Sequence, residues 1–308
     1  MNNKIVDIII IGGGISGSYL SFKLKKHGYK VLIIEKSKGV GGRMCTKPVG
    51  GNLVDYGCQH ITPKTDTLLS ILSDLQQKSI VKKINIGHED AFMAPYGMNK
   101  IPQCLSLGVP TITSSFVERL EHKKNYWITH TPHSLYHSRF IVLTMPIKQV
   151  QLLLENSKIS TRELPNVNFK EFFTATFEGN IGKEKETLNE SKSFPWICNN
   201  TLKGLRNTSD VFTVNLFSKM NKKYHQLDSK QKISVLHKLL KENGFKHVKY
   251  LSLHYWKYAY SSKQNNISHI FDERINLGIC GDSFSIGKVD GAVQSSDKVY
   301  QDLLQAFN

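Results

Sequence analysis

Two short apolar runs near the N-terminus enclose a glycine-rich loop and a segment of mixed apolar and polar residues. Residues 5–11 are apolar except for Asp7, and residues 31–34 are apolar throughout. Runs of this length without alternation are typical of strands buried on both faces of a parallel sheet. Gly28 is well placed to end a helix after His27, since glycine readily adopts the left-handed conformation found there. The pattern therefore predicts a strand, a helix and a second strand.

Similar patterns return in the middle and at the end of the chain. Residues 140–145 form a largely apolar run that stops at Pro146, as expected of a buried strand, because proline cannot donate to a sheet ladder. Residues 126–130 resemble a strand that precedes it. Residues 275–280 predict a further short strand, and residues 289–304 predict a C-terminal helix. Together with the first unit, these elements predict an α/β fold.

The loop between the first two apolar runs has a spacing with a chemical meaning. Residues 12–17 read GGGISG, which is a GxGxxG pattern between a predicted strand and a predicted helix. Gly12 can turn the chain sharply, Gly14 lets the backbone approach a pyrophosphate, and Gly17 lets the helix lie close to the strand. Free N–H groups at the helix start, near Ser16, then face the phosphates. The alternative is an ordinary glycine turn between core strands.

An acidic residue follows the second apolar run. Glu35 lies where a carboxylate can accept hydrogen bonds from both hydroxyls of an adenosine ribose. An acid at this position favours an unphosphorylated ribose. The βαβ unit therefore predicts a site for NAD or FAD rather than NADP.

Composition narrows the function classes. The chain of 308 residues has a net charge of +16, but its lysines are scattered and no nucleic-acid motif accompanies them, so solvated basic faces are the favoured interpretation. No apolar run approaches the roughly 20 residues that span a bilayer, and the first strand leaves no room for a signal peptide. The five widely spaced cysteines lack any CxxC pair, which argues against a disulfide framework or a zinc site and suits the cytoplasm.

A second glycine-rich block favours FAD over NAD. Residues 39–44 read GVGGRM, and a pyridine-nucleotide dehydrogenase has no need of such a block. In a flavoprotein this loop can wrap the far side of the pyrophosphate. Arg43 is the candidate to neutralise the phosphates by charge-assisted hydrogen bonds, with a surface arginine as the alternative.

The C-terminal part supplies the other half of this predicted site. Asp282 ends a predicted strand and could accept a hydrogen bond from the ribityl chain, or could be a turn residue. Residues 291–293 lie at the predicted start of the last helix. The positive end of that helix dipole would stabilise negative charge on a reduced flavin.

Five blocks occur here in the order in which they occur in the renalase family, and the chain resembles that branch of the FAD-dependent amine-oxidase-like superfamily. The blocks are residues 12–17, 41–44, 55–62, 142–146, and 281–282 with 290–291. The resemblance implies a discontinuous Rossmann-like FAD-binding domain with an inserted α+β substrate domain, in the topology of p-hydroxybenzoate hydroxylase and the amine oxidases. The FAD-binding domain would comprise residues 1–62, 108–150 and 274–308, and the substrate domain would comprise 63–107 and 151–273.

The resemblance also implies which residues would line the cofactor, held without a covalent bond. Val117 would do so through its backbone, at the adenine. The substrate face of the flavin would be approached by His60, Trp196 and Trp256. The cofactor-binding set is Gly12, Gly14, Ser16, Gly17, Glu35, Lys36, Gly42, Arg43, Gln59, His60, Val117, Gly281, Asp282, Gly291, Ala292 and Val293.

Renalase-like enzymes oxidise misreduced NAD(P)H, dihydronicotinamide dinucleotides that carry hydride at the wrong ring carbon. The hydride passes to flavin N5, and O2 then accepts the electrons and gives H2O2. Such chemistry needs orientation and stacking more than an acid–base pair. Trp196, Tyr255, Trp256 and Tyr258 are candidate stacking walls, although the two tryptophans could equally pack in the core. His60 is more simply a residue that orients the flavin or packs than a catalytic one.

Two other functions stay open at this point. An amine oxidase would favour an acidic, aromatic pocket for an ammonium group, and the basic composition weighs modestly against it. The third interpretation is a flavin-binding protein that has lost turnover. The sequence otherwise predicts a small-molecule substrate and O2 as partners, with no metal, no nucleic acid and no membrane.

Overall fold

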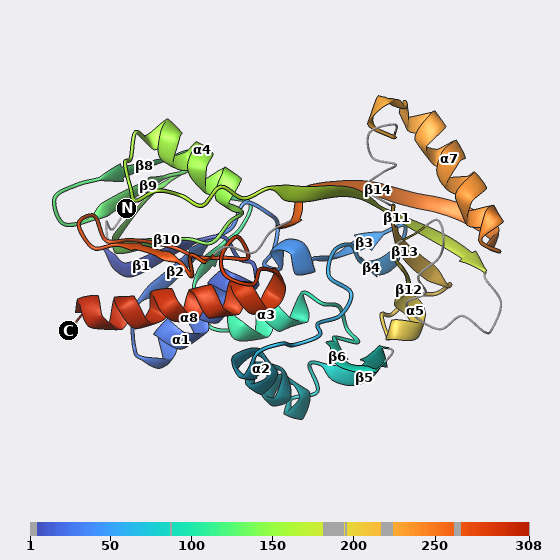
Figure 1. Ribbon diagram of the computed structural model, residues 1–308, viewed down its shortest axis with the longest axis horizontal. Coiled ribbons are helices and arrows are strands. Elements are labelled where there is room, and N and C mark those ends of the chain that lie inside the picture. The colour runs from blue at the N-terminus through green and yellow to red at the C-terminus, as the bar shows by residue number, and fades with distance from the viewer. Residues whose placement is uncertain are drawn as a thin grey trace.

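Two β-sheets lie side by side along the longest axis of the molecule, one in each half (Figure 1). The computed structural model describes residues 5–86, 88–180, 194, 196–216, 224–261 and 266–307. Within these residues the predicted α/β class is confirmed. The proposed division of the chain into two domains stays a prediction.

The larger sheet contains eight strands in the described residues, with the order β15-β16-β10-β1-β2-β7 and an antiparallel extension by β9 and β8. Strand β1 lies parallel to both β10 and β2, as the two apolar runs and the run before Pro146 predict. The strands are β1 (Val6–Ile11), β2 (Val31–Ile34), β7 (Thr111–Ile112), β8 (Arg119–His122), β9 (Trp127–His130), β10 (Leu135–Leu143), β15 (Ile270–Asp272) and β16 (Leu277–Ile279).

Helices cover both faces of this sheet, and that explains the unbroken apolar runs. Ile8 and Ile10 pack with residues of α1 (Ile15–Lys26) and α8 (Lys288–Phe307) on one face. Ile9 and Ile11 pack on the other face with residues of α4 (Ile147–Ser157). Figure 1 shows α4 on one side of the sheet and the α1–α8 pair on the opposite side. Since neither face meets water, β1 needs no polar position after Asp7.

The end of the first helix agrees with the sequence-based prediction. Helix α1 ends at Lys26, His27 is its C-cap, and Gly28 has φ +83°. The predicted C-terminal helix is also confirmed and extends to Phe307. No helix among the described residues is both long and apolar enough to cross a bilayer.

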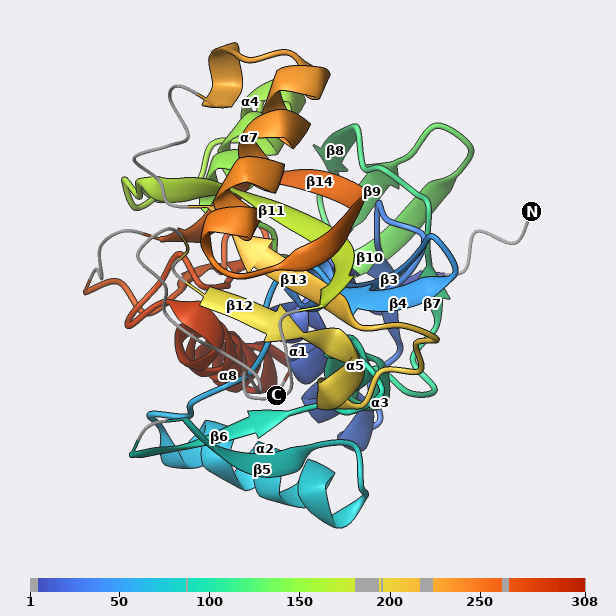
Figure 2. The same cartoon turned by 90° about the vertical axis from the view of Figure 1, so that its right-hand side faces the viewer.

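The second sheet has the order β12-β13-β11-β14 in the described residues, with antiparallel neighbours. Helix α7 covers its outer side, where Leu236 and Leu240 are fully buried against the strands (Figure 2). The elements are β11 (Phe169–Asn180), β12 (Trp196–Asn199), α5 (Asn200–Lys203), β13 (Val211–Asn215), α7 (Ser229–Glu242) and β14 (Lys246–Ser261).

A third group of elements lies beside the N-terminal end of α1. Its apolar core includes Leu68, Leu72, Phe92 and Ile101, and it also buries Tyr19 of α1. It contains the small hairpin β5 with β6, whereas the hairpin β3 with β4 lies against the second sheet, where Val54 packs with Val211. The elements of the group are the 3₁₀ turn η1 (Gly42–Met44), α2 (Asp66–Gln77), β5 (Lys82–Ile86), β6 (Glu89–Met93) and α3 (Lys100–Leu105). The other hairpin consists of β3 (Thr46–Val49) and β4 (Asn52–Asp55).

Candidate cofactor and substrate site

The glycines of the first loop differ in what the structure requires of them. Gly12 follows β1 with φ +109°, a conformation that favours glycine. A Cβ on Gly17 would lie 2.1 Å from the carbonyl oxygen of Gly12, so the close approach of α1 to β1 requires glycine there. Gly14, the N-cap of α1, has an ordinary φ of −78°, and no described atom lies within 4 Å of the position a Cβ would take. Neither conformation nor packing therefore demands glycine at residue 14, and open space at a helix N-terminus fits the approach of a phosphate.

Glu35 directly follows β2 and is held by backbone donors. Gly13 donates its N–H to Oε2 and Ser37 donates its N–H to Oε1, both at 2.7 Å. The residue is buried, whereas the adjacent Lys36 is exposed. Val117, the predicted neighbour of an adenine, is buried in the connection between β7 and β8. The two N–H bonds orient the carboxylate and leave each oxygen a further lone pair for a hydroxyl donor.

The second glycine block approaches the first loop. Gly41 has φ +147° and Gly42 has φ +54°, and a Cβ on Gly42 would lie 3.1 Å from the Cα of Gly14. Gly41 donates its N–H to the carbonyl of Gly13 at 2.8 Å. The structure thus brings residues 12–17 and 39–44 together, as a loop that wraps one phosphate site requires.

Arg43 and Asp282, which the sequence predicts on different parts of a flavin, are joined in a bidentate ion pair. The Nη1–Oδ2 distance is 2.6 Å and the Nη2–Oδ1 distance is 2.5 Å. Nη1 also donates to the carbonyl of Ala259 at 3.1 Å. Burial alone would lower the pKa of Arg43, but the charge and hydrogen bonds of Asp282 outweigh it and raise the pKa. The guanidinium therefore stays charged and fixed beside β14.

The start of α8 closes the same region. Asp282 and Gly281 precede it, and the Ser295 hydroxyl lies 2.9 Å from the N–H of Gly281, which donates to it. Gly291 is tightly packed, because a Cβ there would lie 2.8 Å from the carbonyl oxygen of Phe284. Ala292 and Val293 are buried.

A hydrogen bond joins this helix to the first glycine loop. Ser16 and Ser296 lie 2.5 Å apart between their hydroxyl oxygens. The N-terminal turn of α1 and the first half of α8 are thus in direct contact, although 280 residues separate the two serines. Ser16, predicted to lie near a phosphate, therefore lies at the junction of both chain ends.

One face of the second sheet, which we call the inner face, carries Trp196, Thr174, Asn215, His254 and Trp256. Cross-strand partners share a face, and the register pairs Thr174 with both Asn215 and His254 and pairs Asn215 with Trp196. Trp256 is two residues beyond His254 on β14 and so points to the same side.

The inner face lies against the segment that contains the remaining predicted residues. The His254 ring packs edge-on against Tyr56 with centroids 5.8 Å apart. A Cβ on Gly57 would lie 3.3 Å from Trp256. Two of the predicted substrate-face residues, Trp196 and Trp256, therefore share this face, while Tyr255 points the other way and packs on Phe173 at 5.0 Å in the core under α7.

Gln59 and His60 follow Gly57 in that segment. The Gln59 amide donates to the carbonyl of Asp55 at 2.6 Å. Burial lowers the pKa of His60 below its ordinary 6.5, and the charges of Lys203 and Lys288 lower it further. Among the described residues no group bonds His60 Nδ1, Gln59 Oε1 or Trp256 Nε1, although all three atoms are buried.

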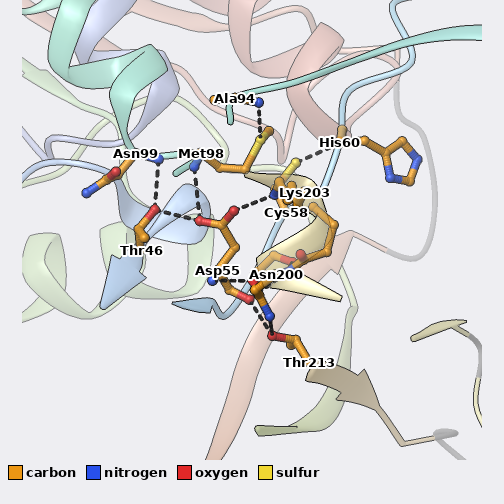
Figure 3. A network of polar contacts seen from close by, with 12 residues as sticks. Thr46, Asp55, Cys58, His60, Ala94, Met98, Asn99, Asn200, Lys203 and Thr213 are labelled. Atoms are coloured by element: carbon orange, nitrogen blue, oxygen red, sulfur yellow. Dashed lines mark hydrogen bonds and ion pairs between the residues drawn. The ribbon is translucent and has the colours of Figure 1, made fainter. Parts of the chain in front are cut away.

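Sequence reasoning did not anticipate a buried ion pair beneath this segment. Lys203 and Asp55 have no side-chain exposure, and the ammonium donates to Oδ2 of Asp55 (Figure 3). Asp55 ends the short strand β4 (sequence NLVD), which by itself does not signal a buried cation. No local pattern marks Lys203, because its partner is 148 residues away.

Comparison with known proteins agrees with this geometry. The family model described as "NAD(P)-binding Rossmann-like domain" matches residues 10–75, which include the first glycine loop, Glu35 and the second glycine block. The fold and site thus define a dinucleotide-binding protein of the Rossmann-like class.

Similar proteins narrow that class. The chain is 33% identical over 95 residues to "FAD-dependent oxidoreductase dbaF" of Emericella nidulans, covering 28% of this chain and 20% of that protein. It is 32% identical over 84 residues to "Amine oxidase [flavin-containing] A" of Sus scrofa, covering 27% of this chain and 16% of that protein. The structure of cyclohexylamine oxidase from Brevibacterium oxydans has the same fold, with a TM-score of 0.64 and 13% identity over 99% of this chain and 100% of that one.

Over these stretches the chain is similar to FAD-dependent oxidoreductases and amine oxidases, and it shares the fold of cyclohexylamine oxidase. It matches only about a fifth or less of the length of the two curated relatives named above.

Proposed function

We propose that this protein is an FAD-dependent oxidoreductase that oxidises misreduced dihydronicotinamide dinucleotides, with O2 as the electron acceptor. Each turnover would consume one dihydropyridine ring, one O2 and one proton, and would release one pyridinium ring and one H2O2. FAD supplies the two-electron acceptor between the two molecules when it is bound.

The described residues fit the ADP half of FAD. The space at Gly14, which no described atom fills, would admit a pyrophosphate at the N-terminus of α1. Glu35 would accept the ribose hydroxyls on the lone pairs that Gly13 and Ser37 leave unused. The remaining predicted cofactor residues, from Arg43 to Val293, flank the same region, and their contacts with FAD are part of this proposal.

The observation that carries the choice of substrate is the chemistry of the inner face. Its residues are aromatic or neutral and polar. The carboxylates of Asp55 and Glu178, near this face, are both paired: Asp55 with Lys203, and Glu178 with Lys249 at 3.1 Å. An ammonium substrate needs a free carboxylate or an aromatic cage with favourable charge around it. The wall described here suits a neutral dihydropyridine ring whose dinucleotide carries negative charge.

The chain's own residues would act by orientation and not by proton transfer. Trp256 and Trp196 would stack on the substrate ring and exclude water from it. His60 would stay neutral at neutral pH, because burial and two lysines disfavour its protonation. Hydride donation from a dihydropyridine needs no general base, so this arrangement is sufficient once donor and acceptor are aligned.

The test begins with the purified protein. Its cofactor is released by denaturation and identified by chromatography, and the intact protein is then mixed anaerobically with borohydride-generated NADH isomers, with ordinary NADH, and with putrescine or cyclohexylamine. Rapid loss of the visible flavin band with the isomers alone, followed by H2O2 formation on adding O2, is the expected result. Bleaching by the amines instead would favour the amine oxidase interpretation. A flavin that none of these donors reduces would favour a flavin-binding protein without turnover.

A further inference from the structure

The Lys203–Asp55 ion pair has an unusually complete set of partners on its acidic side. Oδ1 of Asp55 accepts hydrogen bonds from the Thr46 hydroxyl at 2.5 Å and from the N–H of Met98 at 3.0 Å. Oδ2 accepts from Lys203. The carboxylate is therefore held from three directions in a place without solvent (Figure 3).

The main chain of Asp55 is held as firmly as its side chain. Its N–H donates to Oδ1 of Asn200 at 3.0 Å, and its carbonyl accepts from the Thr213 hydroxyl at 3.0 Å. Asn200 in turn donates to Thr213 at 2.7 Å. Asn200 and Lys203 belong to α5, and Thr213 belongs to β13, so the second sheet holds the last residue of β4 through both backbone and side chain.

Stability alone does not account for such a pair. Removing two charges from water costs several kcal/mol per ion, and well-packed apolar residues in place of a buried pair are often neutral or stabilising. Keeping the pair is useful where one conformation must be selected over others. The segment selected here, Gly57–His60, starts two residues after Asp55 and packs on Trp256 of the inner face.

We propose that Lys203 is a positioning residue: through Asp55 it fixes the segment Asp55–His60 against the second sheet, and its ammonium lies behind that segment. The inference deepens the proposed function and depends on it for the identity of the substrate. Lys203 touches neither substrate nor cofactor in this proposal, and it acts through Asp55 and through its charge.

The charge reaches the groups that line the segment. Lys203 opposes protonation of the His60 imidazole and lowers its pKa. It also favours the thiolate of Cys58, although burial still raises the pKa of Cys58 to about 11. The charged groups that act on His60 are Lys203 from α5 and Lys288 from the start of α8. Together with burial, both lysines disfavour the protonated form of His60.

The test uses the full-length protein with the neutral double substitution Lys203→Met with Asp55→Asn. Methionine retains the length of the side chain, and asparagine retains an oxygen for Thr46 and Met98. The matched control is Lys64→Met with Glu89→Gln, which removes an exposed ion pair just after the same segment. Both double variants change the net charge by zero, so differences between them report the buried pair.

Two measurements do not depend on any substrate. In the buried double variant the His60 imidazole, followed by NMR with His60→Gln for assignment, should titrate at higher pH than in the parent protein. The amide protons of Cys58 and Met98 should exchange about tenfold faster. The control variant should leave both unchanged. If His60 titrates as before and both amides stay protected, the proposal is wrong.

A third measurement connects the pair to the reaction. The rate of flavin reduction by the best donor should fall about tenfold or more in the buried double variant and remain unchanged in the control. If the parent protein is reduced by no donor, the proposed function fails, while the NMR and exchange results still decide the role of Lys203. If the double variant does not fold, Lys203→Arg is used instead, because it keeps the charge. In this variant His60 should titrate as in the parent protein, whereas the larger guanidinium should still make the amides of Cys58 and Met98 exchange faster. Unchanged exchange would contradict the anchoring role.

Discussion

Arg43 and Asp282 form a two-bond ion pair although 239 residues separate them in the sequence. Arg43 lies in the turn after the second glycine block, and Asp282 follows β16 at the other end of the chain. The pair also reaches β14 through the carbonyl of Ala259. It therefore ties the second glycine block, the segment after β16 and the second sheet together at one point.

We expect Arg43→Gln to lower the free energy of unfolding by about 2 to 4 kcal/mol, because it leaves the buried carboxylate of Asp282 without its cation. The double substitution Arg43→Gln with Asp282→Asn should recover part of that loss, since it removes the unpaired charge. Urea denaturation of the three proteins measures both effects. A double variant no more stable than Arg43→Gln would show that the buried charge is not the cause.

Substitution by alanine should affect mainly stability at Gly17 and mainly FAD binding at Gly14. Gly17→Ala should cost about 2 kcal/mol or more, because its Cβ would lie 2.1 Å from a backbone oxygen. Gly14→Ala should change stability by less than about 1 kcal/mol, since the space is open. If that space holds the pyrophosphate of FAD, Gly14→Ala should still weaken FAD binding about tenfold or more. Thermal unfolding measures the effects on stability, and FAD titration measures the effects on binding. Unimpaired FAD binding by Gly14→Ala would contradict a pyrophosphate site at Gly14.

Tyr255 and Trp256 are neighbours in sequence on opposite faces of β14. Tyr255→Ala should destabilise the protein by about 2 kcal/mol, because the ring packs on Phe173 and His225 in the core under α7. Trp256→Ala should instead weaken binding of the proposed dihydropyridine substrate about tenfold, with a smaller loss of stability. Denaturation curves and anaerobic substrate titrations of both variants test the assignment of the two faces. Equal effects of both changes on substrate binding would argue against it.

His60 should make the folded protein sensitive to mild acid. The unfolded chain binds a proton at the ordinary pKa of 6.5, whereas burial lowers the pKa in the folded protein. As the pH falls below 6.5 the unfolded state therefore binds more protons, and stability decreases until the pH reaches the lowered folded pKa. His60→Gln should flatten the dependence of the unfolding free energy on pH in that window. The same slope in parent and variant would assign the acid sensitivity to other groups, such as His254, whose pKa burial also lowers.

Local patterns alone predict the strands and helices around the nucleotide loop. Ile8 to Ile11 are buried on alternate faces of one sheet, and a strand covered on both sides must be apolar at every position, so its sequence identifies it without any partner. Most of the glycine loop is equally local. A Cβ on Gly17 would meet an atom of the same βαβ unit, and Gly28 ends the helix within that unit, whereas a Cβ on Gly12 would meet Thr144, which follows β10.

Tertiary structure decided the pairings and the faces. Asp55 and Lys203 are 148 residues apart, and Arg43 and Asp282 are farther still, so no spacing along the chain reveals that each carboxylate has a cation. A strand with aromatic residues at both Tyr255 and Trp256 is equally compatible with either face turned toward the site. The packing of α7 on one side and of Gly57 on the other makes that choice, because burial and charge pairing depend on distances in space that the order of residues does not contain.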